Sequence, residues 1–176
     1  MPKDNPIAVS QHSDSFNTAM NKMLDDYTAM TESFVNWDSV AIDQHAVALQ
    51  QSLSNINFHE LKDSTIYQTA TSYRDNFKND LNTIQEATDL TKKRQALNSF
   101  SQNLYDLLRI VRYDRGKVYL QECPMAFNDN DPGLWLSRST DIRNPYLGLH
   151  HPKYGKAMIE CGDNKDSLNY AALATP

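Results

Sequence analysis

With 176 residues, of which 40% are hydrophobic, the chain can bury one core but is too short to form two full domains. Its net charge is −5, and its lysines and arginines are scattered, so no basic stripe could follow a nucleic-acid backbone. No apolar run approaches the roughly 18 to 20 residues that cross a bilayer. We therefore expect neither a nucleic-acid partner nor a transmembrane segment.

The start of the chain is polar and contains Pro2 and Pro6. It lacks the basic segment followed by an apolar stretch that marks a secretory signal peptide. We expect residues 1–12 to form a flexible lead and residues 13–176 to form a single domain. The protein could still be exported, because the mature part of an exported protein also lacks a signal peptide.

Four segments place apolar residues at spacings of three and four, which predicts amphipathic helices. The stripes cover residues 16–34, 42–53, 66–84 and 97–111. Asp38 is the expected N-cap of the second helix, and residues 54–64 read as a polar link. Since residues 13–114 contain no Gly or Pro, we predict an antiparallel four-helix bundle over this range.

The composition changes after Asp114. All five glycines follow it, together with the prolines at 124, 132, 145 and 152. We expect residues 115–170 to form a tail of turns and short strands packed on the bundle. Alternation predicts one strand at residues 117–121. Residues 128–133 do not match the spacing of a calcium loop and are predicted to form a turn.

The tail also holds the residues best suited to chemistry. Cys123 and Met125 form a C-x-M motif, Met158 and Cys161 form an M-x-x-C motif, and His150-His151 lies between them. Thiolates and thioethers are soft donors that suit Cu(I) and Ag(I). The predicted metal ligands are therefore Cys123, Met125, Met158 and Cys161, with His150 and His151 as optional imidazole donors, and the predicted cofactor is copper as Cu(I).

A second reading of the same cysteines is structural. Cys123 and Cys161 would form a disulfide that fastens the tail, and both thiolates would then be lost to a metal. Met125 and Met158 would be ordinary apolar contacts, and the two histidines would belong to a solvated turn. No nucleophile motif or phosphate-binding loop is present, so we do not expect an enzyme.

Four ordered blocks of the tail resemble a bacterial family of unknown function. They are residues 119–126 (YLQECPMA), 133–137 (GLWLS), 142–148 (IRNPYLG) and 158–162 (MIECG). The helical part is similar to that family too, so the resemblance covers about residues 20–170. Residues 149–156 (LHHPKYGK) depart from the pattern as an insertion, which would either add ligands or separate the two halves of the site.

The resemblance implies an exported, periplasmic protein, found alone or attached to the adaptor (membrane-fusion) subunits of copper and silver efflux systems. It implies that Cys123, Met125, Met158 and Cys161 bind heavy metal and that the two cysteines lie close in space. The expected partner is an efflux adaptor or another envelope protein. The alternative is a docking module of such a system, fastened by a Cys123–Cys161 disulfide.

Overall fold

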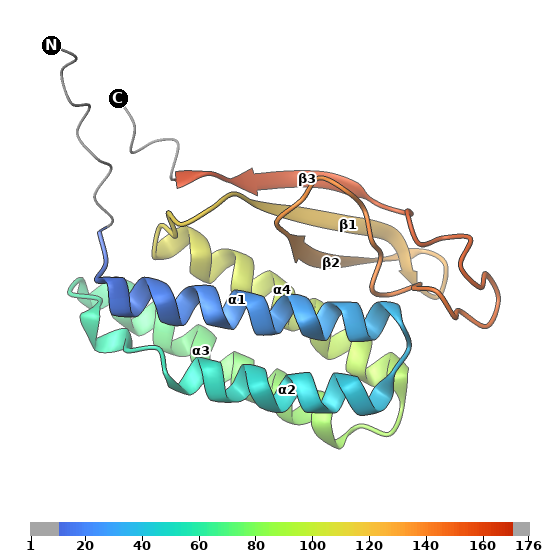
Figure 1. Ribbon diagram of the computed structural model, residues 1–176, viewed down its shortest axis with the longest axis horizontal. Coiled ribbons are helices and arrows are strands. Elements are labelled where there is room, and N and C mark those ends of the chain that lie inside the picture. Colours follow the sequence, from blue (N-terminus) through green and yellow to red (C-terminus); the bar gives the residue numbers. More distant parts are fainter. Residues whose placement is uncertain (1–10, 171–176) are drawn as a thin grey trace, which may run out of the picture.

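The computed structural model describes residues 11–170, in which helices come first and a small sheet follows (Figure 1). Residues 1–10 of the predicted flexible lead lie outside this range. The helical elements are α1 (Asp14–Val35), α2 (Ser39–Ser54), the 3₁₀ helix η1 (Phe58–Glu60), α3 (Ser64–Glu86) and α4 (Leu90–Ile110). Four α-helices were predicted, and their positions are confirmed.

Each α-helix begins at a side chain that caps its first turn. The capping residues Ser13, Asp38, Asp63 and Asp89 accept hydrogen bonds from the backbone N–H groups of Phe16, Ala41, Ile66 and Thr91. These bonds satisfy donors that a helix leaves without partners at its start. The N-cap predicted at Asp38 is confirmed, with Ala41 N at 3.0 Å from its carboxylate.

The predicted apolar stripes form the core between the helices. The largest buried side chains include Phe16, Tyr27, Phe34, Phe77 and Phe100. The link at residues 54–64 differs from its prediction, because Ile56, Phe58 and Leu61 are buried there. The segment is too short to show a helical stripe, and of these three residues η1 contains only Phe58.

The tail forms a three-stranded antiparallel sheet of order β2-β1-β3. Its strands are β1 (Val118–Phe127), β2 (Asp131–Ser137) and β3 (Asp163–Leu168). Of the strand predicted at 117–121, residues 118–121 form the start of β1, which continues to Phe127. Asn128 and Asp129 have φ values of +52° and +62°, typical of a tight hairpin turn, and β2 starts earlier than the predicted turn ends.

The sheet lies against α1 and α4 (Figure 1). Side chains from α1, from α4 and from the segment between β2 and β3 bind backbone groups along the outer edge of β2. Asn98 accepts a hydrogen bond from Leu134 N at 2.8 Å, and Tyr27 accepts one from Leu136 N at 3.0 Å. Tyr146 donates to the carbonyl of Leu134. The edge therefore has no free row of backbone groups for another strand at these positions.

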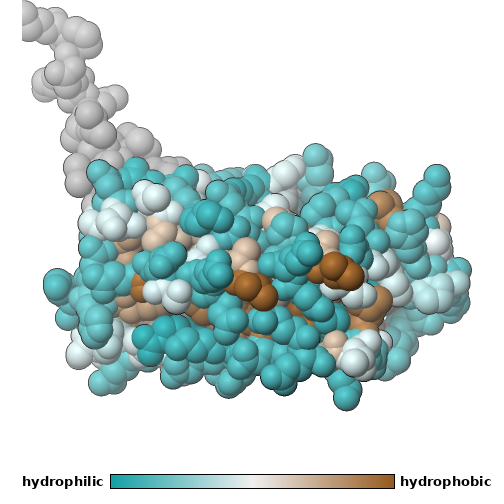
Figure 2. All heavy atoms as spheres, turned by 60° about the horizontal axis from the view of Figure 1, so that its bottom comes forward, coloured by the Kyte–Doolittle hydropathy of each residue, from teal (hydrophilic) through white to brown (hydrophobic). Residues whose placement is uncertain are grey.

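No helix within residues 11–170 is long and apolar enough to cross a membrane. One broad face of the molecule is mostly hydrophilic, and its hydrophobic side chains form isolated spots (Figure 2). Among the described residues, the exposed large hydrophobic side chains are Val40 and Val47, both on α2. We see no continuous apolar patch on this face.

Candidate functional site

Cys123 and Cys161 come together in the folded tail. Cys123 lies in β1 opposite Gly133 and is fully buried, whereas Cys161 precedes β3 and is half-buried. Their Sγ atoms are 3.6 Å apart, and both are free thiols. Because Cys123 has no exposed surface, an ion or oxidant reaches the pair from the side of Cys161.

Gly133 shows why the first three sequence blocks occur together. A Cβ atom at this position would lie 2.7 Å from Ala126 Cβ and 2.9 Å from the ring of Tyr146. Only glycine leaves room for that ring beside the strand that pairs with Cys123. The fully buried Tyr146 thus packs directly against the cysteine-bearing hairpin.

Asn144 connects the third block to the fourth. Its side-chain carbonyl accepts hydrogen bonds from Tyr146 N at 2.8 Å and Leu147 N at 2.9 Å, and its amide donates to Cys161 O at 2.7 Å. Its own N–H donates to Ile159 O at 2.8 Å. Asn144 is fully buried, so it fixes the backbone of the Cys161 turn. In the sequence Asn144 was noted only as part of the third block. Its position before Pro145 was the one feature that could have indicated a structural role.

Gly162 lets the Cys161 turn approach the sheet. A Cβ atom here would lie 2.9 Å from both Glu122 O and the ring of Trp135. The backbone after Cys161 therefore lies against β1 and β2 with no space for a side chain. This contact brings the second thiol to the first.

The protonation of Cys161 depends on this packing. Burial, the hydrogen bond with Cys123 and the charge of Asp163 raise the pKa of Cys161 to about 11. The thiol is therefore protonated at neutral pH and is not a preactivated nucleophile. A bound cation would have to displace its proton.

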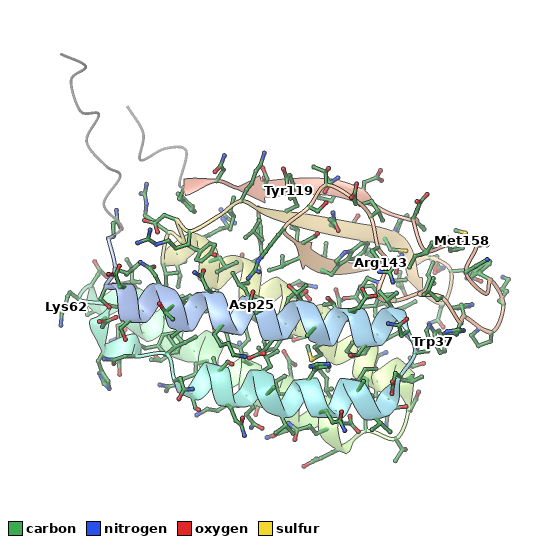
Figure 3. The ribbon with its side chains drawn as sticks, viewed as in Figure 1. Asp25, Trp37, Lys62, Tyr119, Arg143 and Met158 are labelled. Atoms are coloured by element: carbon green, nitrogen blue, oxygen red, sulfur yellow. The ribbon has the colours of Figure 1, made fainter. Side chains whose placement is uncertain are left out.

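The two methionines flank the cysteines along the chain. Met125 lies two residues beyond Cys123, where the register between β1 and β2 shifts. Met158 accepts a hydrogen bond from Cys161 N through its carbonyl, at 3.0 Å, and lies at the end of the molecule where Trp37 is found (Figure 3). Both side chains are half-buried against the core.

The insertion at residues 149–156 folds as a loop of its own. His151 and Gly155 form an isolated antiparallel bridge, and Asp129 binds both Lys153 and Tyr154. His151 Nδ1 accepts hydrogen bonds from the backbone N–H groups of Lys153 and Tyr154. The insertion does not separate the two halves of the site, since the thiols lie 3.6 Å apart.

The predicted histidine donors do not join the thiols. His150 is exposed, and the His151 ring lies 5.7 Å from the Trp37 ring, measured between centroids. Within residues 11–170, no three His, Cys, Asp or Glu side chains are grouped so that they could hold a metal ion. Two adjacent histidines between the sulfur motifs were a reasonable basis for predicting metal ligands. The bridge between His151 and Gly155 instead holds His151 in the insertion loop beside Trp37.

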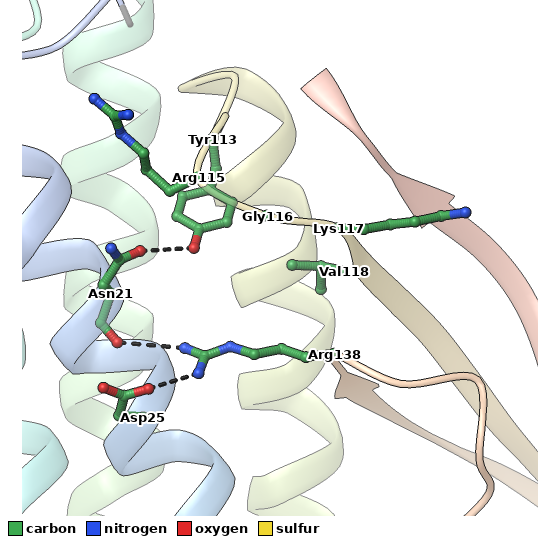
Figure 4. Close-up of a pocket in the computed structure, with 8 residues that line it drawn as sticks. All are labelled: Asn21, Asp25, Tyr113, Arg115, Gly116, Lys117, Val118 and Arg138. Atoms are coloured by element: carbon green, nitrogen blue, oxygen red, sulfur yellow. Dashed lines mark hydrogen bonds and ion pairs between the residues drawn. The ribbon is translucent and has the colours of Figure 1, made fainter. Parts of the chain in front are cut away.

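A separate cavity of about 280 Å³ lies between α1 and the sheet (Figure 4). Arg138 donates to Asp25 at 2.6 Å, and Tyr113 donates to Asn21 at 2.6 Å. These polar groups satisfy one another across the cavity. The two hydrogen bonds connect the tail to α1. Because the polar groups are already paired, they do not indicate a ligand for this cavity.

The sequence profile of the family described as "protein of unknown function (DUF3347)" matches residues 23–116. The match includes most of α1, all of α2, α3 and α4, and more than half of the chain. The chain belongs to this family. The DUF3347 match ends before β1, so it does not include the four blocks of the tail, and the resemblance assigned to them stays a prediction. No curated protein and no solved structure shows significant similarity to the chain.

Proposed function

We propose that the protein binds one soft metal ion, Cu(I) or Ag(I), between Cys123 and Cys161. The observation that carries this proposal is the distance of 3.6 Å between the two sulfur atoms. Two metal–sulfur bonds of about 2.3 Å that meet at a tetrahedral angle span about 3.8 Å between sulfurs. The existing separation therefore fits one bridging ion after a small adjustment.

Met125 and Met158 are the proposed additional ligands. Each follows or precedes a cysteine by a few residues, and neither is fixed in the fully buried core. Methionine has three rotatable bonds, so its thioether can turn toward an ion held by the thiols. Soft thioethers favour Cu(I) over Mg²⁺ or Ca²⁺, which prefer oxygen ligands.

The proposed role is to hold or pass the ion, without catalysis. We place the protein in the periplasm, with an adaptor subunit of an efflux system or another envelope protein as its partner. The scaffold is proposed to be an antiparallel four-helix bundle, because the links between its helices are short. The motif resemblance of the tail supports this setting.

The deciding experiment is an anaerobic competition titration of the freshly reduced protein with Cu(I) and a chromophoric chelator. We expect one equivalent to bind to the wild type and none to the Cys123→Ser, Cys161→Ser double variant. Met125→Leu and Met158→Leu should each weaken binding while leaving the thiols in place. Equal binding by the wild type and the double cysteine variant would refute the site.

The second candidate function is a docking module fastened by a disulfide. The same sulfur contact favours it, because the two atoms need to approach from 3.6 Å to about 2.05 Å. The oxidised protein would be lighter by two hydrogens in intact mass spectrometry without reductant. Reduction would then lower the free energy of unfolding by roughly 2–4 kcal/mol, and Cu(I) would have no effect on the reduced form.

A further inference from the structure

A second cavity, of about 470 Å³, lies where four segments of the chain meet. Its walls come from the start of α4, Trp37 between α1 and α2, the hairpin turn after β1, and the insertion loop at His151–Lys153. It lies on parts of the chain that the copper proposal does not use. We call it the Arg94 cavity.

Arg94 lines this cavity and is only 6% exposed. The face of its guanidinium lies over the Trp37 ring, with Cζ 3.8 Å from the ring centroid. Its Nε and Nη2 atoms are shielded from solvent and have no hydrogen-bond partner within the described residues. These two nitrogens lie on the same edge of the guanidinium. Such an edge can donate two parallel hydrogen bonds to one carboxylate.

Burying Arg94 in this way is costly, because two of its donors have lost water without receiving an acceptor, and the charge of Asp89 compensates only part of the charge on the arginine. Burial lowers the pKa of Arg94 to about 10, so the group is still charged at neutral pH. Stacking on Trp37 offsets part of this cost but uses only the face of the guanidinium. The Nε and Nη2 edge still lacks an acceptor, and a ligand reaches it only when the side chains that shield it shift.

The charges around the cavity favour a ligand with a single negative charge. The carboxylate of Asp89 accepts a hydrogen bond from Thr91 N, and Asp129 is paired with Lys153 at 3.0 Å. His151 Nδ1 accepts hydrogen bonds from the backbone N–H groups of Lys153 and Tyr154, so this nitrogen offers no donor to an anion. Asp89 and Asp129 would therefore oppose a dianion such as phosphate more strongly than a monoanion.

The apolar part of the lining is suited to an apolar body attached to that anion. Trp37, Phe127 and Tyr146 supply aromatic surface, and Leu90 and Pro152 add aliphatic surface. The remaining lining is mostly polar, and includes Thr91, Gln95 and Asn128. A cavity that combines aromatic surface with a few placed polar groups and one buried charge is typical of a small-molecule site. The ligand class follows from the arginine edge and these walls together.

We propose that the Arg94 cavity binds a small monocarboxylic acid with an aromatic or aliphatic body, its carboxylate held by the Nε and Nη2 edge of Arg94. This site is independent of the copper proposal. No sequence pattern marks this site, because Arg94 is one of three consecutive basic residues, Lys92-Lys93-Arg94.

Benzoate is the test ligand, and benzamide is its neutral match in shape. Titration of the full chain is followed by calorimetry and by the ¹H–¹⁵N signal of Arg94 Nε–H, at constant ionic strength. We expect saturable binding of benzoate with a dissociation constant on the order of 1 mM or below, and benzamide at least about tenfold weaker. Benzoate should also shift the Arg94 Nε–H signal.

Arg94→Gln removes the charged edge and should weaken benzoate binding at least about tenfold. Arg74→Gln is the matched control, because Arg74 lies over the Phe58 ring at 5.8 Å and does not line the cavity. Its Nε has no hydrogen-bond partner and lies 3.5 Å from Asp75 Oδ1. This control variant should bind benzoate as the wild type does. The comparison of benzoate with benzamide on the wild type needs no variant, so a folding defect in Arg94→Gln would not leave the question open.

Three results would overturn the proposal. They are the absence of saturable benzoate binding, equal binding of benzamide and benzoate, and unchanged benzoate affinity in a folded Arg94→Gln protein. Tighter binding of inorganic phosphate than of benzoate would overturn the assignment to monocarboxylates. None of these results bears on the Cu(I) titration.

Discussion

At the scale of single residues, Gly133 makes the site sensitive to one added methyl group. In Gly133→Ala the new Cβ would meet Ala126 and the ring of Tyr146 at less than 3 Å. We expect a loss of about 1–3 kcal/mol in the free energy of unfolding, measured by urea denaturation, because a packed core resists extra volume. Gly116→Ala is the control, since its Cβ would meet only Tyr113 Oη at 4.0 Å. Equal effects of the two variants would contradict this packing.

At the scale of elements, Asp80 affects how α3 packs on α4. Its carboxylate accepts a hydrogen bond from Ser99 at 2.9 Å, and burial raises its pKa from 3.8 to about 6. A raised carboxyl pKa means that the folded state holds the proton more tightly than the unfolded state. Its contribution to stability is therefore greatest below pH 4 and declines as the pH rises toward 6.

Asp80→Asn removes this pH dependence while keeping an acceptor for Ser99. We expect the variant to be more stable than the wild type at pH 7.5 by roughly 1 kcal/mol, a value reduced by solvent screening of the half-buried carboxyl. At pH 3.5 the difference should vanish. Chemical denaturation at both pH values measures it, with the exposed Asp75→Asn of the same helix as control. A difference that does not change with pH would contradict the assignment.

At the scale of the whole molecule, Tyr27 connects α1 to both α4 and the sheet. Its hydroxyl shares a hydrogen bond with Ser101 at 2.7 Å and accepts one from Leu136 N at 3.0 Å. In Tyr27→Phe the Leu136 N–H would be buried without a partner. We expect a loss of roughly 2 kcal/mol in the free energy of unfolding, measured by urea denaturation.

Tyr119→Phe, on the sheet above the helices in Figure 3, is the matched control and should change stability by much less. If both variants had the same stability, the bond between Tyr27 and the edge of β2 would not help to hold the sheet on the helices. Phe at position 27 keeps the ring, so the comparison isolates the hydroxyl group.

The sequence by itself determined the four helices, because their stripes and capping residues depend on neighbours three or four positions apart. It also indicated which residues of the tail carry soft sulfur donors. It could not give the full extent of β1 or predict β2 and β3, since strands form by pairing between distant segments and the tail has only one clear alternation.

Only the tertiary structure decided how the candidate sites are composed. The contact between Cys123 and Cys161 depends on the buried Asn144 amide and on two glycines that admit close backbone approach. The separation of His151 from the thiols depends on a loop that closes on itself. The buried Nε and Nη2 edge of Arg94 has no acceptor in the described surroundings. Side-chain surroundings are a property of packing that no local sequence pattern records.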